Sequence, residues 1–209
     1  LIVVEGWSAA GKGFLINRMI QPLDPRGFKV TCIASPNRDE QLRPFLWRFW
    51  RRTPSAERMA IFDRSWYRNL LDEVVDGNLN ERDLEKAYAD IRSFERQLRD
   101  SGTVIFKFFL DISKKEQAQR SQALRENPNT SWRVDDAVLA RHYKYDEYKK
   151  VSKQMFEETD VVDGAHWQVI DTTKFLPATV QILETLVNLL QSKVEKRKNG
   201  IFIRNCTAA

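Results

Sequence analysis

The feature that most constrains this sequence is Gly-Trp-Ser-Ala-Ala-Gly-Lys-Gly at residues 6–13, directly after the apolar run Leu1–Glu5. The spacing G-x-x-x-x-G-K between a strand and a helix is that of a phosphate-binding loop, or P-loop. Its glycines allow backbone angles that aim successive N–H groups at phosphate oxygens, and a helix beginning near Lys12 adds its positive dipole end. The predicted phosphate-binding residues are Gly6, Ala9, Ala10, Gly11, Lys12 and Gly13. The alternative is a glycine-rich turn that only connects a strand to a helix.

Strand-like and helix-like segments alternate along the chain. The helical pattern with Leu84, Ile91 and Leu98 on one face begins after Asn80 and ends at Gly102, and a second apolar face runs through Pro177–Leu190. The short apolar or β-branched runs are Leu1–Glu5, Phe28–Ala34, Met59–Asp63, Thr103–Leu110 and Trp167–Asp171. Five strands separated by helices predict an α/β fold with a five-stranded, mainly parallel sheet.

A second acidic motif follows the third of these strands. The apolar run Met59–Phe62 ends in Asp63, as expected of a strand that delivers a Mg²⁺-binding carboxylate beside a P-loop. Arg64 comes next and is placed to reach a phosphoryl group in transfer. The alternative for Asp63 is a carboxylate that caps the following helix. One departure from the P-loop pattern is Gly13, which replaces the usual Ser or Thr ligand of Mg²⁺.

Composition excludes several classes of protein. The chain has 209 residues, enough for one domain, and none of its apolar runs approaches the roughly 20 residues that cross a membrane. Two cysteines cannot form a disulfide framework, so we expect a reducing, cytoplasmic location, with Cys32 buried in its strand. Two histidines make a multi-histidine metal site implausible.

Basic residues are concentrated in two stretches. Eight arginines and four acids lie between Arg38 and Arg68, and eleven Lys or Arg residues and seven acids lie between Lys107 and Lys153. The two stretches could line a groove for a polyanion, or they could be ordinary solvated helix faces. The sequence has no recognisable nucleic-acid-binding motif, so we expect no nucleic-acid partner and no membrane partner.

The P-loop and the second motif together resemble the second polyphosphate kinase family, whose members move phosphoryl groups between inorganic polyphosphate and nucleotides. The resemblance covers nearly the whole chain. It is carried by the segments Gly6–Gly13, Leu23–Phe28, Leu46–Trp50, Phe62–Tyr67, Lys107–Leu110, Ser113–Gln117, Tyr145–Tyr148 and Glu158–Asp160. Phe14–Asn17, taken with Leu23–Phe28, is most similar to polyphosphate:AMP phosphotransferases built from two fused domains.

The resemblance implies a three-layer α/β/α P-loop kinase fold with a helical lid over about residues 113–141, a Mg²⁺ requirement and a basic channel for polyphosphate. It implies catalytic roles for Lys12, Asp63, Arg64 and Arg120 and a nucleotide contact by Glu73. The family carries an acid where this chain has Ser8, so Asp63 and Ser8 remain as the metal ligands. Loss of that acid could slow transfer by about 10³-fold.

We therefore expect residues 1–192 to form a polyphosphate kinase-like domain and residues 193–209 a linker or tail. The predicted function is Mg²⁺-dependent phosphoryl transfer between polyphosphate and AMP or ADP. The alternatives are a catalytically weak polyphosphate-binding or regulatory domain and an ATP-dependent nucleoside monophosphate kinase. The chain begins within a strand pattern and without Met, so we expect a fragment of a longer protein, with a fused second domain or a homo-oligomer.

Overall fold

The computed structural model describes residues 1–160 and 165–198, and residues 199–209 of the expected tail lie outside the described part. Five strands, all paired in parallel, form one sheet in the order β2-β3-β1-β4-β5. The strands are β1 (Ile2–Gly6), β2 (Phe28–Cys32), β3 (Met59–Asp63), β4 (Phe106–Asp111) and β5 (Trp167–Asp171). Each of them overlaps one of the five runs that the sequence indicated, which confirms the parallel α/β sheet.

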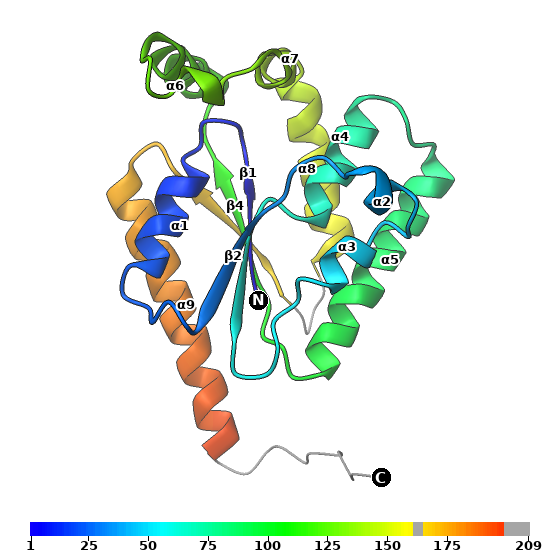
Figure 1. The fold of residues 1–209 in the computed structure, drawn as a ribbon, viewed down its shortest axis with the longest axis vertical. Coiled ribbons are helices and arrows are strands. Elements are labelled where there is room, and N and C mark those ends of the chain that lie inside the picture. Colours follow the sequence, from blue (N-terminus) through cyan, green and yellow to red (C-terminus); the bar gives the residue numbers. More distant parts are fainter. Residues whose placement is uncertain (161–164, 199–209) are drawn as a thin grey trace.

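Helices cover both faces of the sheet and one of its ends (Figure 1). The helices are α1 (Lys12–Ile20), α2 (Arg38–Gln41), α3 (Trp47–Trp50), α4 (Trp66–Val75), α5 (Glu81–Asp100), α6 (Lys114–Glu126), the 3₁₀ turn η1 (Ser131–Arg133), α7 (Asp136–Tyr143), α8 (Tyr145–Thr159) and α9 (Phe175–Lys198). Helices α1 and α9 pack together on one face, and α4, α5 and α8 pack together on the other. This is the three-layer arrangement expected from the sequence.

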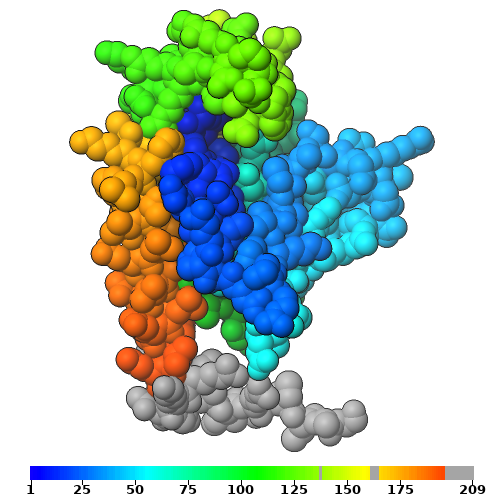
Figure 2. Space-filling model, turned by 60° about the vertical axis from the view of Figure 1, so that its left-hand side comes forward, coloured from blue at the N-terminus to red at the C-terminus, as the bar shows by residue number. Residues whose placement is uncertain are grey.

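The segment expected to form a lid stands over the carboxyl end of the sheet. It contains α6, η1 and most of α7, which project beyond the strands in Figure 1 and form the green cap in Figure 2. The carboxyl ends of parallel strands are where open α/β sheets bind their ligands. The lid segment is therefore placed to cover any ligand held there.

Local sequence signals explain the boundaries of α5. The side chain of Asn80 accepts a hydrogen bond from the Asp83 backbone N–H, and Gly102 adopts a left-handed φ of 90° after the helix ends. Four of the apolar residues at i, i+3 and i+4 spacing are buried, namely Tyr88, Ile91, Phe94 and Leu98, and Leu84 is partly buried. The predicted start and end of this helix are confirmed.

Helix α9 is longer than its apolar pattern indicated. The pattern ran over Pro177–Leu190, whereas the helix continues to Lys198, so residues 193–198 of the expected tail are helical. Across the described residues, none of the helices combines the length and the apolar character that crossing a membrane requires.

Burial differs between the central and the edge regions of the fold. Trp66 and Tyr67 are fully buried in the core. Cys32, which the sequence predicted to be buried, is exposed. The reason is strand order, because β2 lies at the edge of the sheet and is covered less completely than the central strand β1.

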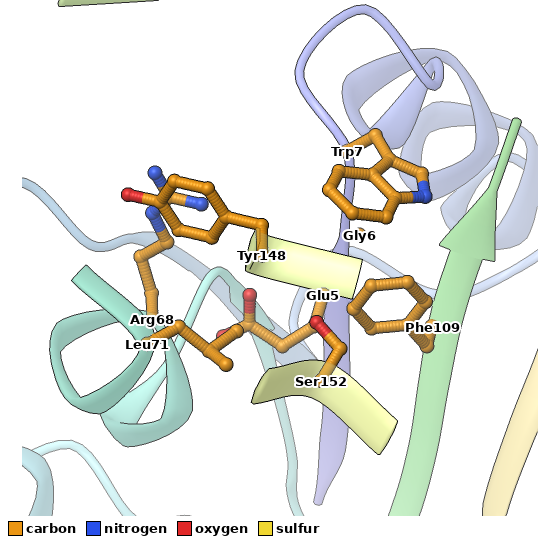
Figure 3. Close-up of a pocket in the computed structure, with 8 residues that line it drawn as sticks. All are labelled: Glu5, Gly6, Trp7, Arg68, Leu71, Phe109, Tyr148 and Ser152. Atoms are coloured by element: carbon orange, nitrogen blue, oxygen red, sulfur yellow. The ribbon is translucent and has the colours of Figure 1, made fainter. Parts of the chain in front are cut away.

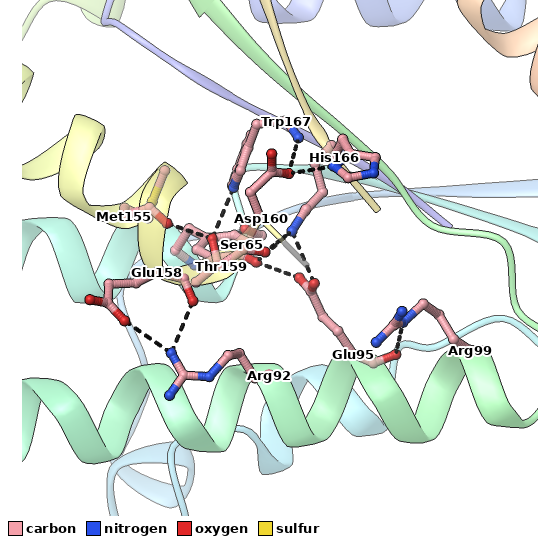
Figure 4. Close-up of polar contacts among 12 residues, drawn as sticks. Ser65, Arg92, Glu95, Arg99, Met155, Glu158, Thr159, Asp160, His166 and Trp167 are labelled. Carbon is pink, nitrogen blue, oxygen red and sulfur yellow. Dashed lines mark hydrogen bonds and ion pairs between the residues drawn. The ribbon is translucent and has the colours of Figure 1, made fainter. Parts of the chain in front are cut away.

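A buried ion pair joins the sheet to the helices on one face. Lys107 of β4 donates from Nζ to Glu95 Oε2 of α5 at 3.1 Å and to the Thr159 carbonyl of α8 at 2.8 Å. The Tyr67 hydroxyl of α4 donates to the other Glu95 oxygen. Figure 4 shows Glu95 and Thr159 facing one another across this network. Every polar group in it has a partner, so the buried charges fix how α4, α5 and α8 sit on the sheet.

Candidate functional site

The loop between β1 and α1 has the backbone conformation that its glycines predicted. Gly6 has a φ of 130° and Gly11 a φ of 90°. A Cβ at Gly6 would lie 2.3 Å from the Leu110 carbonyl oxygen, and a Cβ at Gly11 would lie 2.3 Å from the Phe175 ring. Both positions therefore need glycine for space as well as for conformation. Gly13 differs, because nothing lies within 4 Å of a Cβ built there.

Lys12 is folded back onto its own loop. Its Nζ donates to the carbonyl oxygens of Gly6 at 2.9 Å and Trp7 at 2.8 Å. The pKa of Lys12 is lowered to about 8, chiefly by burial and next by the nearby positive charge of Arg64, while Asp63 and Glu5 act in the opposite direction. The ammonium group thus has carbonyl partners and no carboxylate salt bridge among the described residues, which leaves its charge available to an anion.

The turn after β3 holds Asp63 and Arg64 beside the P-loop. Asp63 pairs with Val4 of β1 and with Cys32 of β2 in the sheet register. Arg64 has a φ of 65°, which is uncommon for a residue other than glycine, and its N–H donates to the Val4 carbonyl at 3.0 Å. Strained backbone of this kind persists where its surroundings enforce it and is frequent at functional sites.

Glu5 ties this turn to the P-loop strand. Its buried carboxylate accepts hydrogen bonds from the Ser65 N–H at 2.6 Å and the Ser65 hydroxyl at 2.8 Å. The same hydroxyl accepts from the Tyr67 N–H and so caps the start of α4. Burial raises the pKa of Glu5. Sequence analysis missed Glu5, although an acid within an otherwise apolar buried strand was a visible signal.

A small cavity lies directly under the loop (Figure 3). Its volume is about 10 Å³, which is room for about one water molecule. Glu5, Arg68 and Ser152 supply polar groups, and aromatic side chains, including Trp7 and Phe109, form part of its walls. Trp7 stacks on Tyr145 at 4.2 Å between ring centroids and donates from its indole to Asp111. The base of the loop is therefore packed tightly, and this cavity is too small to hold a substrate.

A second group of cations comes from α4 and the lid. Arg68 forms an ion pair with Asp72 at 2.7 Å, and Asp72 also accepts from the Tyr148 hydroxyl of α8. Burial lowers the pKa of Arg141 in α7, and the positive charges of Arg68 and Arg64 lower it as well. The Nε of Arg141 is buried and has no hydrogen-bond partner within the described structure. Lys12, Arg64, Arg68 and Arg141 thus form a positive cluster, hereafter the cation cluster.

Sequence analysis gave no role to Arg68 or Arg141. Arg68 directly follows the motif Phe62–Tyr67, but Arg141 lies 73 residues farther along the chain, and only the fold brings it near α4. Asp72 is the acidic residue of α4 that contacts this cluster. Glu73 was the expected nucleotide contact, but its side chain is exposed and has no partner among the described residues.

Arg120 lies at the base of the lid rather than in the cation cluster. Its guanidinium donates to Glu116 at 2.7 Å, to the Thr172 and Thr173 carbonyls at 2.8 and 3.0 Å and to the Ala9 carbonyl at 3.5 Å. It also stacks over the Phe175 ring. In this conformation its donors are engaged with protein oxygens, so it joins the P-loop, α6 and the start of α9.

The remaining predicted positions lie along the P-loop. Ala9 has a φ of 61°, Ala10 is fully buried, and its N–H donates to the Trp7 carbonyl. Ser8 is partly exposed, and its backbone carbonyl accepts from Gln117 of α6. Asp63 is the carboxylate on β3 beside the loop. Within residues 1–160 and 165–198, no group of three or more His, Cys, Asp or Glu side chains is arranged to hold a metal ion.

Comparison with known proteins identifies the family of the chain. The family model described as polyphosphate kinase 2 (PPK2) matches residues 1–198. The chain is 38% identical over 192 residues to a polyphosphate:AMP phosphotransferase from Acinetobacter johnsonii, covering 92% of this chain and 40% of that protein. It is 34% identical over 174 residues to an AMP/ADP-polyphosphate phosphotransferase from Meiothermus ruber, covering 83% of this chain and 65% of that protein.

A solved structure gives the same result. The crystal structure of polyphosphate kinase 2 from Arthrobacter aurescens TC1 superposes with a TM-score of 0.87 at 31% identity, covering 91% of this chain and 67% of that one. The chain spans about two-fifths of the length of the first of the curated relatives above. With the family model matched over nearly its whole length and the fold shared, the chain belongs to the polyphosphate kinase 2 family.

Proposed function

We propose that this chain catalyses Mg²⁺-dependent phosphoryl transfer between inorganic polyphosphate and a nucleotide, AMP or ADP. The observation that carries the proposal is the cation cluster beside the P-loop, in which the four positive charges of Lys12, Arg64, Arg68 and Arg141 outnumber the nearby carboxylates Glu5, Asp63 and Asp72. Such a cluster stabilises a bound polyanion. Membership of the polyphosphate kinase 2 family, whose relatives are named for polyphosphate and for AMP or ADP, supports the choice of substrates.

The reaction needs positioning and neutralisation of charge more than a strong base. A nucleotide phosphate oxygen is already ionised at neutral pH and would attack the terminal phosphorus of polyphosphate in line. The bond from that phosphorus to its bridging oxygen breaks, and the polyphosphate chain leaves one phosphate shorter. Lys12 would leave the Gly6 and Trp7 carbonyls and contact the transferring phosphoryl group together with Arg64. The inward N–H groups of the loop would hold the neighbouring phosphates. Arg68 and Arg141 would neutralise the remaining negative charge from α4 and the lid.

The donor set is compatible with Mg²⁺. Mg²⁺ in phosphoryl-transfer sites is bound by one or two carboxylates, substrate phosphates and water, so a cluster of three protein ligands is not required. Asp63 offers the carboxylate beside Lys12, and Ser8 offers a hydroxyl. When bound, the ion would neutralise charge on the phosphate oxygens. Arg120, engaged with the Ala9 and Thr172 carbonyls, would position the loop, and Glu73 remains a predicted nucleotide contact.

A second candidate function is supported by Ser8. The family acid is absent at that position and Gly13 adds no hydroxyl, so Asp63 stands without the usual oxygen donors on the loop. A domain of this kind could bind polyphosphate and transfer phosphoryl groups slowly or not at all.

The deciding experiment supplies polyphosphate or ATP as donor and AMP or ADP as acceptor, with Mg²⁺ or with EDTA, and separates the nucleotides by chromatography. We expect ADP or ATP to form from polyphosphate only with Mg²⁺. If product forms with ATP as the donor but not with polyphosphate, the chain is a nucleoside monophosphate kinase instead. Tight binding of polyphosphate without product would identify a binding domain.

A further inference from the structure

A basic hollow lies at the end of the sheet opposite the P-loop. Its volume is about 260 Å³, and it opens between the amino-terminal ends of β2 and β3. Because all strands are parallel, the amino-terminal ends of β2 and β3 lie at the opposite end of the sheet from Lys12 and Asp63. The residues that line it come from two segments, 26–29 and 52–60, and we call it the edge hollow.

The lining of the edge hollow carries positive charge only. Four of its side chains are cations, namely Arg26, Lys29, Arg52 and Arg58, and none of the described residues that line it is acidic. Thr53 and Ser55 add hydroxyl groups, while Phe28, Pro54 and Met59 form an apolar wall. Several like charges around a concave surface reinforce one another and attract anions more strongly than isolated surface charges do.

Two of the four cations are balanced by acids outside the hollow. Arg26 pairs with Asp24 at 2.7 Å, and Arg52 pairs with Glu40 at 3.0 Å. The other two form no ion pair among the described residues, although Asp24 lies near enough to Arg58 for their charges to interact. Arg58 donates to the Arg26 carbonyl at 2.6 Å, and the side chain of Lys29 is exposed and forms no hydrogen bond or ion pair within the described structure. The hollow therefore keeps a net positive charge that its protein surroundings do not cancel.

Size restricts the ligand. Pockets that enclose a whole small molecule measure about 300–1,000 Å³, so this hollow is at the lower limit for a complete nucleotide. A linear chain of phosphates is narrow, carries about one negative charge per unit and needs no enclosing walls. The P-loop site and the edge hollow are separated by roughly the length of β2, about 16 Å at 3.3 Å per residue.

We propose that the edge hollow is a second binding site for a linear chain of phosphates, separate from the P-loop, and that its ligand is a segment of inorganic polyphosphate away from the reacting end. The identity of the ligand rests on the proposed function, whereas the site itself rests on the charge and shape of the hollow. The phosphate chain of a nucleoside triphosphate shares this chemistry, and the experiment separates the two sources.

The test uses the full chain with Lys29→Gln and Arg58→Gln combined, and calorimetric titration with long-chain polyphosphate and with tripolyphosphate. We expect the affinity for long-chain polyphosphate to fall roughly 5- to 30-fold. The affinity of the P-loop site for tripolyphosphate, a chain too short to reach from the P-loop to the hollow, should not change. Lys86→Gln with Arg96→Gln is the matched control, because it removes two exposed cations of α5 that do not line the hollow. Equal losses in both double variants, equal losses for both ligands, or no loss at all would overturn the proposal.

Two further arms keep the result interpretable. Lys29→Gln alone removes no bond of the folded chain, so it tests the site even if Arg58→Gln disturbs folding, and it should cost about 2- to 5-fold in long-chain affinity. In a Lys12→Ala background, long-chain polyphosphate should still bind through the hollow, which separates failure of this site from failure of phosphoryl transfer. If Lys29→Gln weakens the binding of ATP but not that of polyphosphate, the assignment of polyphosphate as the ligand is wrong.

Discussion

Two lysines of this molecule, one fully and one partly buried, lie in contrasting surroundings. Lys107 sits between β4, α5 and α8, where Glu95 balances its charge and the Thr159 carbonyl accepts a further hydrogen bond. Lys12 sits at the P-loop, where two carbonyl oxygens hold it and the neighbouring cations oppose its charge. Burial lowers the pKa of both side chains. The difference is that the charge of Lys107 is used within the fold, whereas that of Lys12 is left for a ligand.

Replacing Lys12 should separate activity from stability. Lys12→Ala is expected to lower phosphoryl-transfer turnover by about 10³-fold, since it removes a donor that stabilises transition-state charge. The midpoint of thermal unfolding should stay the same or rise, because the substitution removes a buried charge that lacks a carboxylate salt bridge among the described residues. Steady-state kinetics and calorimetry of both proteins measure this. Unchanged turnover would remove Lys12 from the mechanism.

Replacing Lys107 should have the opposite effect. Lys107→Met leaves Glu95 buried beside Tyr67 without its cation, so we expect the free energy of unfolding to fall by about 3–5 kcal/mol. Turnover per folded molecule should change little. The double variant Lys107→Met with Glu95→Met should recover much of the loss, because it removes both charges together. Urea unfolding of the three proteins gives the comparison, and a single variant as stable as the parent would contradict it.

Replacing Ser8 tests whether the P-loop lacks a ligand for Mg²⁺. Ser8→Asp places a carboxylate on the P-loop, where Mg²⁺ favours hard oxygen ligands, and Asp is close to Ser in size. Turnover should rise about 10-fold, and only with Mg²⁺ present, because without the ion the new charge repels polyphosphate. Rates measured against Mg²⁺ concentration for both proteins check this. Flat or lower turnover at saturating Mg²⁺ would show that Ser8 does not replace a lost metal ligand.

The pH dependence of phosphate binding should report Lys12 directly. Its pKa is about 8 in the unliganded protein, lowered by burial first and by Arg64 second, so it loses its proton as pH rises through 8. Between pH 7 and pH 9 the protonated fraction, and with it the share of tripolyphosphate affinity that depends on Lys12, should fall about 10-fold. Lys12→Arg keeps its charge over this range and should not show the fall.

The lowered pKa of Lys12 also makes the free energy of unfolding depend on pH. An unfolded lysine keeps its proton up to its ordinary pKa near 10.4, whereas folded Lys12 releases it near 8. Between these values the unfolded state binds more protons, so the free energy of unfolding should increase with pH relative to Lys12→Met. An equal pH response in both proteins would contradict the lowered pKa.

The sequence predicted the fold more completely than the site. Each strand is a local apolar run, and the P-loop is a local motif, so both could be recognised without tertiary information. The exposure of Cys32 could not, because it depends on β2 being an edge strand. Arg141 and Tyr148 were missed for a related reason, since α4, α7 and α8 meet only after folding. The bonds from Arg120 to backbone carbonyls leave no trace in residue types.

The ties made by Arg120 also determine how the lid can move. They fasten the middle of α6 to the P-loop and to the residues before α9, while Gln117 adds a bond to the Ser8 carbonyl. The part of α6 beyond Arg120, together with η1, would rotate about Arg120. Since about 9 Å of α6 lies beyond Arg120, a rotation of about 10° would move the far end of the helix by roughly 1.6 Å and the loop hardly at all. Opening and closing would then be a swing of the lid tip over a phosphate loop that stays in place.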